Sequence, residues 1–171
     1  MRDSTTPKRN GPLPRDPLTR FWPKVEKTET CWLWTGAKTK AGYGMFGLNR
    51  GVGLPQKMTM AHRYSWEIAN GPIPPGIFVD HMCHTKACVN PRHLRLADPK
   101  QNLENRCDAS IKSNTGVRGV SWDKVAGRYR AAVTHNRKHY HVGRYDTLEE
   151  AAEAAKAKRL ELFTHNLHDR T

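Results

Sequence analysis

The segment 78–94 constrains this chain more than any other, because it holds three residues of the kind that bind zinc. Cys83, Cys88 and His93 follow a C-x4-C-x4-H pattern. Thiolates and imidazoles are the ligands that Zn²⁺ takes in structural sites. The spacing therefore predicts a loop clamped by a zinc ion.

A second set of polar residues, with different chemistry, is interleaved with the first. Asp80 and His81 stand just before the zinc-ligand pattern, and Asn102 follows it. Oxygen ligands suit Mg²⁺, and an imidazole with an ordinary pKa of about 6.5 can accept a proton near neutral pH. This second set therefore predicts a magnesium ion and a general base.

Two flanking elements would hold these residues. The apolar residues 77–79 predict a strand that delivers the Asp-His pair at its end. Residues 97–106 lack glycine and predict a helix carrying Asn102, with Asp98 as the N-cap and Pro99 in the first helical position. A strand, a zinc-clamped loop and a helix would place the base opposite a metal ligand.

At these residues the chain resembles the HNH branch of the His-Me finger (ββα-metal) nucleases. The resemblance covers residues 20 to 107 and rests on three parts of the sequence: Asp80-His81, Asn90-Pro91-x-His93-Leu94 and Asn102. The added Cys83, Cys88 and His93 resemble the His-Cys box homing endonucleases, in which an earlier cysteine supplies the fourth zinc ligand. Cys31 is the candidate for that ligand here.

The resemblance also implies a mechanism. Asp80 and Asn102 would hold one Mg²⁺ (or Mn²⁺) ion at the scissile phosphate, and His81 would take a proton from water. Asn90 would hold the loop and orient His81. Family chemistry implies 5′-phosphate and 3′-hydroxyl ends. A zinc site closed by four protein ligands would be structural, and its loss should unfold the loop.

The charge balance indicates the class of partner. Lys and Arg outnumber Asp and Glu by 29 to 16, which gives a net charge of +13 and a pI near 9.9. This excess favours a polyanion, and double-stranded DNA is the leading candidate. There is no run of about eighteen apolar residues to indicate a membrane span. Residues 1–6 begin no apolar signal segment, so we expect a cytoplasmic protein of a bacterial or phage-infected cell that is not secreted.

The part before the zinc-ligand pattern begins with an arm. Residues 1–19 hold four prolines and several charges, which predict a flexible basic arm, and structure should begin near Phe21. Residues 31–34 predict a strand. The neighbouring Trp22, Trp32 and Trp34 should pack a small core.

A β-ribbon is expected next. Residues 42–47 and 57–61 predict two strands joined by a Gly-rich hairpin at 49–55. An antiparallel ribbon can enter a major groove, where Arg50 and Lys57 would face DNA. A solvated hairpin is the alternative.

A short helix should follow at residues 62–69, ended by Asn70-Gly71. Similar nucleases carry a His-Arg pair after the hairpin in the same way. Arg63 would either reach a phosphate or pair with Glu67 one turn later.

The C-terminal part has a different pattern. A polar linker at 108–115 leads into a second domain, 116–165, with a short tail at 166–171. Thr147 and Glu150 form a capping-box pattern for a helix that runs to about residue 163. Three strands and one turn are predicted before it: strands at 116–122, 128–133 and 139–145, and a turn at 136–137.

This second domain resembles the ethylene-response-factor (APETALA-type) DNA-binding domain. The match lies in Gly-Val-Arg-Gly-Val-x-Trp, Arg-Tyr-Arg-Ala and Val-Gly-Arg-Tyr-Asp-Thr-x-Glu-Glu-Ala-Ala. Such domains lay a three-stranded sheet in the major groove. The alternative is that alternate arginines merely keep one strand face soluble. The resemblance implies these DNA contacts: Arg118, Trp122, Arg128 and Arg130, then Lys138, His141 and Arg144.

Together these patterns predict an α+β protein: a zinc-stabilised ββα-metal nuclease domain at 20–107 with an antiparallel ribbon, then a small three-stranded sheet plus helix. The predicted function is a magnesium-dependent HNH homing-type DNA endonuclease. The alternative is a DNA-binding regulator that keeps the nuclease fold without cutting. A double-strand break would need two chains or two visits, so a homodimer stays open. The sequence assigns no role to His84 or Cys107 and no target site.

Overall fold

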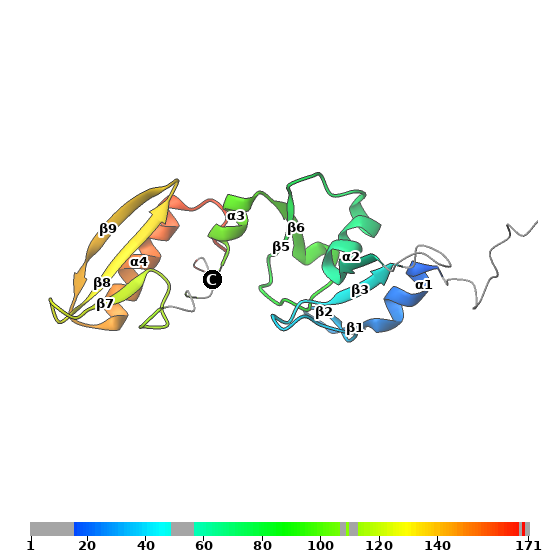
Figure 1. Cartoon of the computed structure of the whole chain (residues 1–171), viewed down its shortest axis with the longest axis horizontal. Coiled ribbons are helices and arrows are strands. Elements are labelled where there is room, and N and C mark those ends of the chain that lie inside the picture. Colours follow the sequence, from blue (N-terminus) through cyan, green and yellow to red (C-terminus); the bar gives the residue numbers. More distant parts are fainter. Residues whose placement is uncertain (1–15, 49–56, 107–108, 110–112, 168, 170–171) are drawn as a thin grey trace, which may run out of the picture. The chain divides into compact units, whose positions relative to one another are not determined.

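The computed structural model describes residues 16–48, 57–106, 109, 113–167 and 169 of the chain (Figure 1). The architecture is mixed α+β, as predicted. Contacts divide the chain into two compact units, one of residues 1–75 with 79–96 and one of residues 76–78 with 97–171. In the part that the structure describes, no helix is both long and apolar enough to span a bilayer.

The first unit is built from short elements around three two-stranded sheets, which pair β1 with β2, β3 with β4, and β5 with β6. In chain order the elements are α1 (Pro17–Phe21), the 3₁₀ turn η1 (Trp22–Lys24), β1 (Val25–Lys27), β2 (Trp32–Trp34), β3 (Met45–Leu48), β4 (Lys57–Met60), α2 (Ala61–Asn70), β5 (Phe78–His81), the 3₁₀ turn η2 (Pro91–His93) and β6 (Leu94–Ala97).

An aromatic cluster forms the core of this unit, as the tryptophan pattern predicted. Phe21, Trp34 and Phe46 are fully buried, and Trp22 and Trp32 pack around them. Structure begins earlier than Phe21, because the Asp16 side chain accepts from the Leu18 N–H and caps α1. The cap carries Phe21 into the core.

The ribbon of β3 and β4 pairs Met45 with Met60 and Leu48 with Lys57. Strand β3 starts later than predicted, because Gly42 has a φ of 92° and makes a turn before it. Gly44 has no room for a side chain, since an added Cβ would lie 2.6 Å from Trp34 Cδ1. The predicted hairpin at 49–55 lies outside the described residues.

Strand β5 runs through the predicted catalytic pair, and the sequence analysis missed β6, which pairs with it. Helix α3 (Pro99–Glu104) has Pro99 in its first position, as predicted, but it ends before residue 106, and Ala97 belongs to β6. Asp98 caps α3 as expected, and Gln101 completes a capping box with it.

The second unit places one helix against a three-stranded antiparallel sheet, ordered β7 (Val120–Asp123), β8 (Arg128–His135) and β9 (Lys138–Tyr145). Helix α4 (Leu148–Leu162) starts at the predicted Thr147–Glu150 capping box and buries Ala151 and Ala155 against Val120 and Ala131. The predicted turn at 136–137 is present, with positive φ at both residues. The first strand begins at Val120 instead of residue 116, because Gly116 and Gly119 have φ of 69° and 82°.

Candidate metal centre and DNA-binding surfaces

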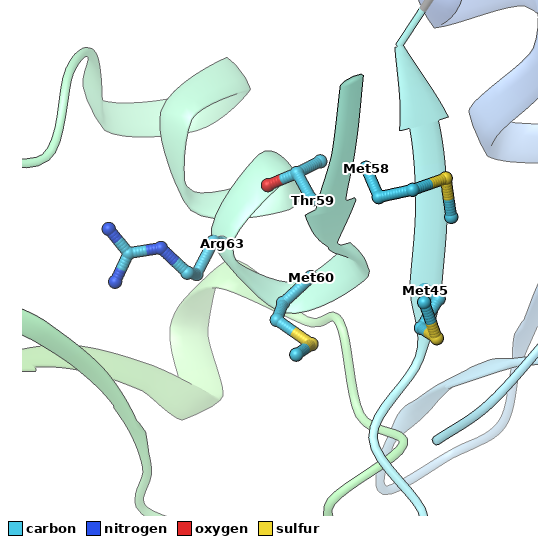
Figure 2. Close-up of a pocket in the computed structure, with 5 residues that line it drawn as sticks. All are labelled: Met45, Met58, Thr59, Met60 and Arg63. Atoms are coloured by element: carbon cyan, nitrogen blue, oxygen red, sulfur yellow. The ribbon is translucent and has the colours of Figure 1, made fainter. Parts of the chain in front are cut away.

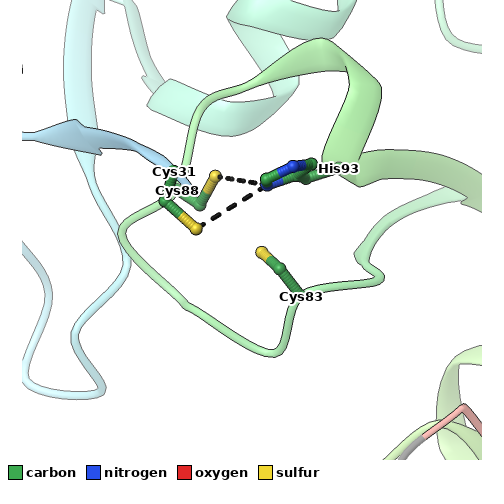
Figure 3. Close-up of side chains that lie close together, drawn as sticks. All are labelled: Cys31, Cys83, Cys88 and His93. Carbon is green, nitrogen blue, oxygen red and sulfur yellow. Dashed lines mark hydrogen bonds between the residues drawn. The ribbon is translucent and has the colours of Figure 1, made fainter. Parts of the chain in front are cut away.

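The four predicted zinc ligands lie together. The ligand atoms of Cys31, Cys83, Cys88 and His93 are all within 4.8 Å of one another (Figure 3). The sulfurs of Cys31 and Cys88 each lie 3.6 Å from His93 Nδ1. A tetrahedral zinc with Zn–S of about 2.3 Å and Zn–N of about 2.05 Å separates sulfur from nitrogen by about 3.6 Å. The donor set and its spacing therefore fit zinc.

Backbone pairing brings the distant Cys31 to this loop. Leu33 forms an antiparallel bridge with Cys88. Trp34 N–H donates to the Ala87 carbonyl at 2.8 Å, and Val89 N–H donates to the Trp32 carbonyl at 2.7 Å. Strand β2 and the loop thus pair just beyond Cys31, and the ligand comes with the strand.

Local hydrogen bonds to the sulfurs favour a thiolate at Cys83. The Asn90 N–H donates to Cys88 Sγ at 3.4 Å. The side-chain hydrogen bond from Cys88 lowers the pKa of Cys83 to about 4, and the same contact raises the pKa of Cys88. A thiolate at Cys83 is the form that binds a metal.

Asp80 and His81 end β5 and are buried, with 8% and 7% of their surface exposed. Arg95, in β6, donates from Nε and Nη2 to Asp80 Oδ2 at 3.1 and 3.0 Å. Sequence reasoning missed Arg95. Its signal was the arginine within the otherwise apolar run Leu94–Ala97.

The hydrogen bond of His81 fixes its tautomer. Nε2 lies 2.9 Å from the Cys88 carbonyl oxygen, which can only accept, so Nε2 carries the proton. In the neutral ring the lone pair then belongs to Nδ1. Burial lowers the pKa of His81, which favours this neutral form. Since Cys88 is also in the metal cluster, the same loop sets both sites.

A second histidine lies beside the first. The rings of His62, in α2, and His81 have centroids 4.6 Å apart, and Tyr43 lies near both. Burial, and then the charges of His81 and Arg63, lower the pKa of His62 to about 3. His62 is therefore neutral. The sequence marked it only as the first member of the His-Arg pair.

The two asparagines are placed differently. Asn90 is buried, and its side-chain oxygen accepts from the Arg92 N–H at 3.1 Å, which caps η2 and holds the loop. Asn102 lies on α3 in the second unit. Its role beside Asp80 stays a prediction.

The ribbon shows an apolar outer face. Met45, Met58 and Met60 line a shallow hollow together with Thr59 and Arg63 (Figure 2). Since Phe46 turns into the core, the methionines lie on the other face of the ribbon. Among the predicted DNA contacts here, Lys57 is exposed at the start of β4, and Arg50 lies outside the described residues.

The sheet of the second unit has a basic face. Arg130 in β8 stands directly opposite Arg144 in β9, so the two side chains share a face, and Arg128 lies two residues away on it. Arg128 pairs with Asp146 at 2.9 Å, and Arg144 pairs with Asp123 at 3.3 Å. Arg130 is exposed and has no acidic partner among the described residues.

Two predicted DNA contacts are placed elsewhere. Trp122 stands opposite Tyr129, and their ring centroids are 4.7 Å apart. Because Tyr129 and Arg130 are neighbours in β8, Trp122 lies on the other face of the sheet from Arg130. The register separates them because side chains alternate along each strand. The Arg118 guanidinium donates to carbonyls at the end of α3, including that of Leu103 at 3.0 Å.

The remaining predicted contacts lie on β9. Lys138 begins the strand, with its ammonium 5.1 Å from the centre of the Tyr140 ring. Both Lys138 and His141 are exposed. The structure does not test their contact with DNA, which stays a prediction.

Comparison with known families agrees with both units. Residues 59–104 match the HNH endonuclease family, and residues 115–165 match the AP2 domain. A relative from Escherichia phage T7, protein 3.8, is 38% identical over 104 residues, which cover 60% of this chain and 84% of that protein. The chain therefore belongs to the HNH endonuclease family, and an AP2 DNA-binding domain follows the HNH region.

Other viral relatives match part of the chain. Protein 7.7 of Escherichia phage T7 is 39% identical over 77 residues, 45% of this chain and 55% of that protein. The "Uncharacterized HNH endonuclease L560" of Acanthamoeba polyphaga mimivirus is 36% identical over 103 residues, 60% of this chain and 52% of its own. The chain thus spans about half the length of these two relatives. No solved structure matches.

Proposed function

We propose that the protein is a metal-dependent DNA endonuclease of the HNH homing type, with His81 as the general base. One observation carries the proposal: the Cys88 carbonyl accepts a hydrogen bond from His81 Nε2, which leaves the lone pair of the neutral ring on Nδ1. Asp80 directly precedes His81 in β5. A base must be neutral at its accepting nitrogen before the proton arrives. The buried, hydrogen-bonded ring meets that requirement.

The chain's own groups supply most of the remaining chemistry. His81 Nδ1 takes the proton from the attacking water. The metal-clamped loop fixes the Cys88 carbonyl, and Asn90 braces that loop at η2. Arg95 fixes the carboxylate of Asp80.

Asp80 and Asn102 are the proposed ligands of the catalytic ion. A carboxylate and an amide oxygen are the hard donors that Mg²⁺ or Mn²⁺ accepts. When bound, such an ion stabilises negative charge on the phosphate and on the leaving oxygen. The cysteine and histidine cluster would hold a separate, structural zinc with no open position for substrate.

The second unit, which contains the AP2 domain and is called the AP2 unit below, supplies DNA binding. Its basic strand face, with Arg128, Arg130 and Arg144, suits the phosphate backbone and guanine edges of a major groove. Trp122 and Arg118 are turned to other neighbours, so we assign the groove contacts to the three arginines. Lys57 of the ribbon and Arg63 of α2 are proposed phosphate contacts.

The test is cleavage of a supercoiled plasmid pool carrying randomised inserts, with magnesium or with EDTA. We expect wild type to convert plasmid to open-circle or linear form only with metal, and His81→Ala to lose about 10²–10⁴-fold in rate. Glu161→Gln, at an exposed residue of α4, is the control and should cut normally. Open circles would indicate nicking, and linear DNA would indicate double-strand cutting.

The competing function is a DNA-binding regulator that does not cut. It would be established if wild type and His81→Ala shifted the same DNA on a gel and neither cleaved any member of the pool. Equal cutting by both proteins would instead remove His81 from the mechanism.

A further inference from the structure

A buried carboxylate anchors helix α3 within the second unit. Glu104 is 3% exposed, and its Oε2 accepts from the Thr164 N–H at 2.9 Å, the Thr164 hydroxyl at 3.1 Å and the His165 N–H at 3.2 Å. Burial alone would raise the pKa of Glu104, but these three hydrogen bonds and the charge of Lys100 together hold the pKa below its usual value. The anchor is therefore charged near neutral pH.

Further contacts hold the end of the same helix. Arg118 donates to the carbonyls of Leu103, Glu104 and Arg106. Asn105, also buried, accepts the Leu167 N–H at 3.3 Å. The last carbonyls of a helix have no partner within the helix, so these donors satisfy groups that would otherwise need water.

Helix α3 depends on this anchoring. It has 6 residues, which is too short to be stable by itself. Its fixed contacts with the rest of the unit come from Arg118, which precedes β7, and from residues 164–167, which follow α4. The helix is thus part of the AP2 unit by packing, although the HNH family match extends to residue 104.

The predicted metal ligand lies on this anchored helix. At about 100° per residue, Asn102 is turned about 200° around the axis from Glu104. Asn102 therefore lies on the opposite side of the helix from Glu104. The anchor can therefore fix the helix without covering the amide.

We propose that Glu104 is a positioning residue, which fixes α3 and thereby Asn102 to the DNA-recognition unit. The inference rests on the proposed function, because it takes Asn102 as a ligand of the catalytic ion. Its consequence is that the sheet that binds DNA and the helix that supplies a metal ligand form one body. A loosened anchor should weaken metal-dependent cutting while DNA binding remains.

The experiment compares full-length wild type, Glu104→Gln and Glu161→Gln. Glu161 is 62% exposed and pairs with Lys158 on α4, so it is a matched surface control in the same unit. For each protein, plasmid cleavage is measured against Mg²⁺ concentration, and DNA affinity is measured by gel shift in EDTA. Hydrogen exchange of the α3 amides reports whether the helix is anchored.

For Glu104→Gln we expect the Mg²⁺ concentration at half-maximal cleavage to rise about tenfold, as for other residues that orient a metal ligand. DNA affinity should stay within about twofold, and α3 should exchange faster. Glu161→Gln should match wild type throughout. If α3 exchanges faster but the magnesium dependence is unchanged, the positioning role is refuted while the endonuclease stands.

Two further outcomes are decisive. If wild type does not cut at any magnesium concentration, the proposed function fails, and the positioning role fails with it. If Glu104→Gln loses its cooperative melt, Thr164→Val replaces it, because that change removes one of the three hydrogen bonds. A smaller rise in required magnesium supports the proposal, and none refutes it.

Discussion

Removing one zinc ligand far from the others should destabilise the first unit strongly. The perturbation is Cys31→Ser, and the residue lies 62 positions from His93 in the sequence. Closing a loop of that length with a cross-link is worth about 4 kcal/mol in the chain-entropy account. Domains of this size are stable by roughly 5–15 kcal/mol, so the loss is a large fraction of the total.

The expected result is a fall in melting temperature of about 15 °C or more, at about 4–8 °C per kcal/mol. Four of the five tryptophans belong to the first unit, so tryptophan fluorescence reports on it. Native mass spectrometry measures zinc per chain. Wild type treated with a strong chelator should melt still lower, because structural zinc contributes about 10–16 kcal/mol in small sites.

Cys107→Ser is the control, since it removes a cysteine outside the cluster's C-x4-C-x4-H pattern. It should bind one zinc and melt like wild type. A Cys31→Ser protein that still binds one zinc per chain and melts within a few degrees of wild type would refute this prediction. Cys31 would then not be a ligand, despite its distance of 3.6 Å from His93 Nδ1.

Three other predictions follow from single contacts. Gly44→Ala should destabilise the first unit by about 1–3 kcal/mol in urea unfolding, because its Cβ would lie 2.6 Å from Trp34 Cδ1; a neutral result would mean that the ring moves freely. Arg130→Ala should lower the slope of log affinity against log salt by about 0.9, measured by fluorescence anisotropy, if the side chain contacts one phosphate. Acid should destabilise the second unit: Glu104 and Asp169 have pKa values below their ordinary 4.5 and 3.8, so their contribution is present above those values and lost as pH falls through the folded ones. Melting temperature against pH should therefore drop more steeply for wild type than for Glu104→Gln, and parallel curves would contradict this.

Several features could be predicted from the sequence because they depend on local chemistry. Asp98 and Thr147 were predicted as the N-caps of their helices, and both caps are present. Cys83, Cys88 and His93 lie within eleven consecutive residues, so their spacing alone indicated a shared metal site. Cys31 came from the family resemblance, and it lies within the same cluster.

Other features depend on contacts between residues far apart, which a local pattern does not reveal. The anchoring of α3 comes from Glu104 and Thr164, 60 residues apart. The separation of Trp122 from Arg130 depends on strand register, which the basic pattern of the sequence did not specify. Arg95 finds Asp80 only because β6 pairs with β5.

The wide spacing of the metal ligands has a consequence for synthesis on the ribosome. Cys31 emerges 62 residues before His93, and at about 5–20 residues per second the interval is roughly 3–12 s. For most of that interval β2 lacks the loop residues 87–89 that pair with it, and Cys31 lacks the other three ligands of the cluster. The nascent chain therefore cannot assemble the four-ligand cluster until His93 has been made.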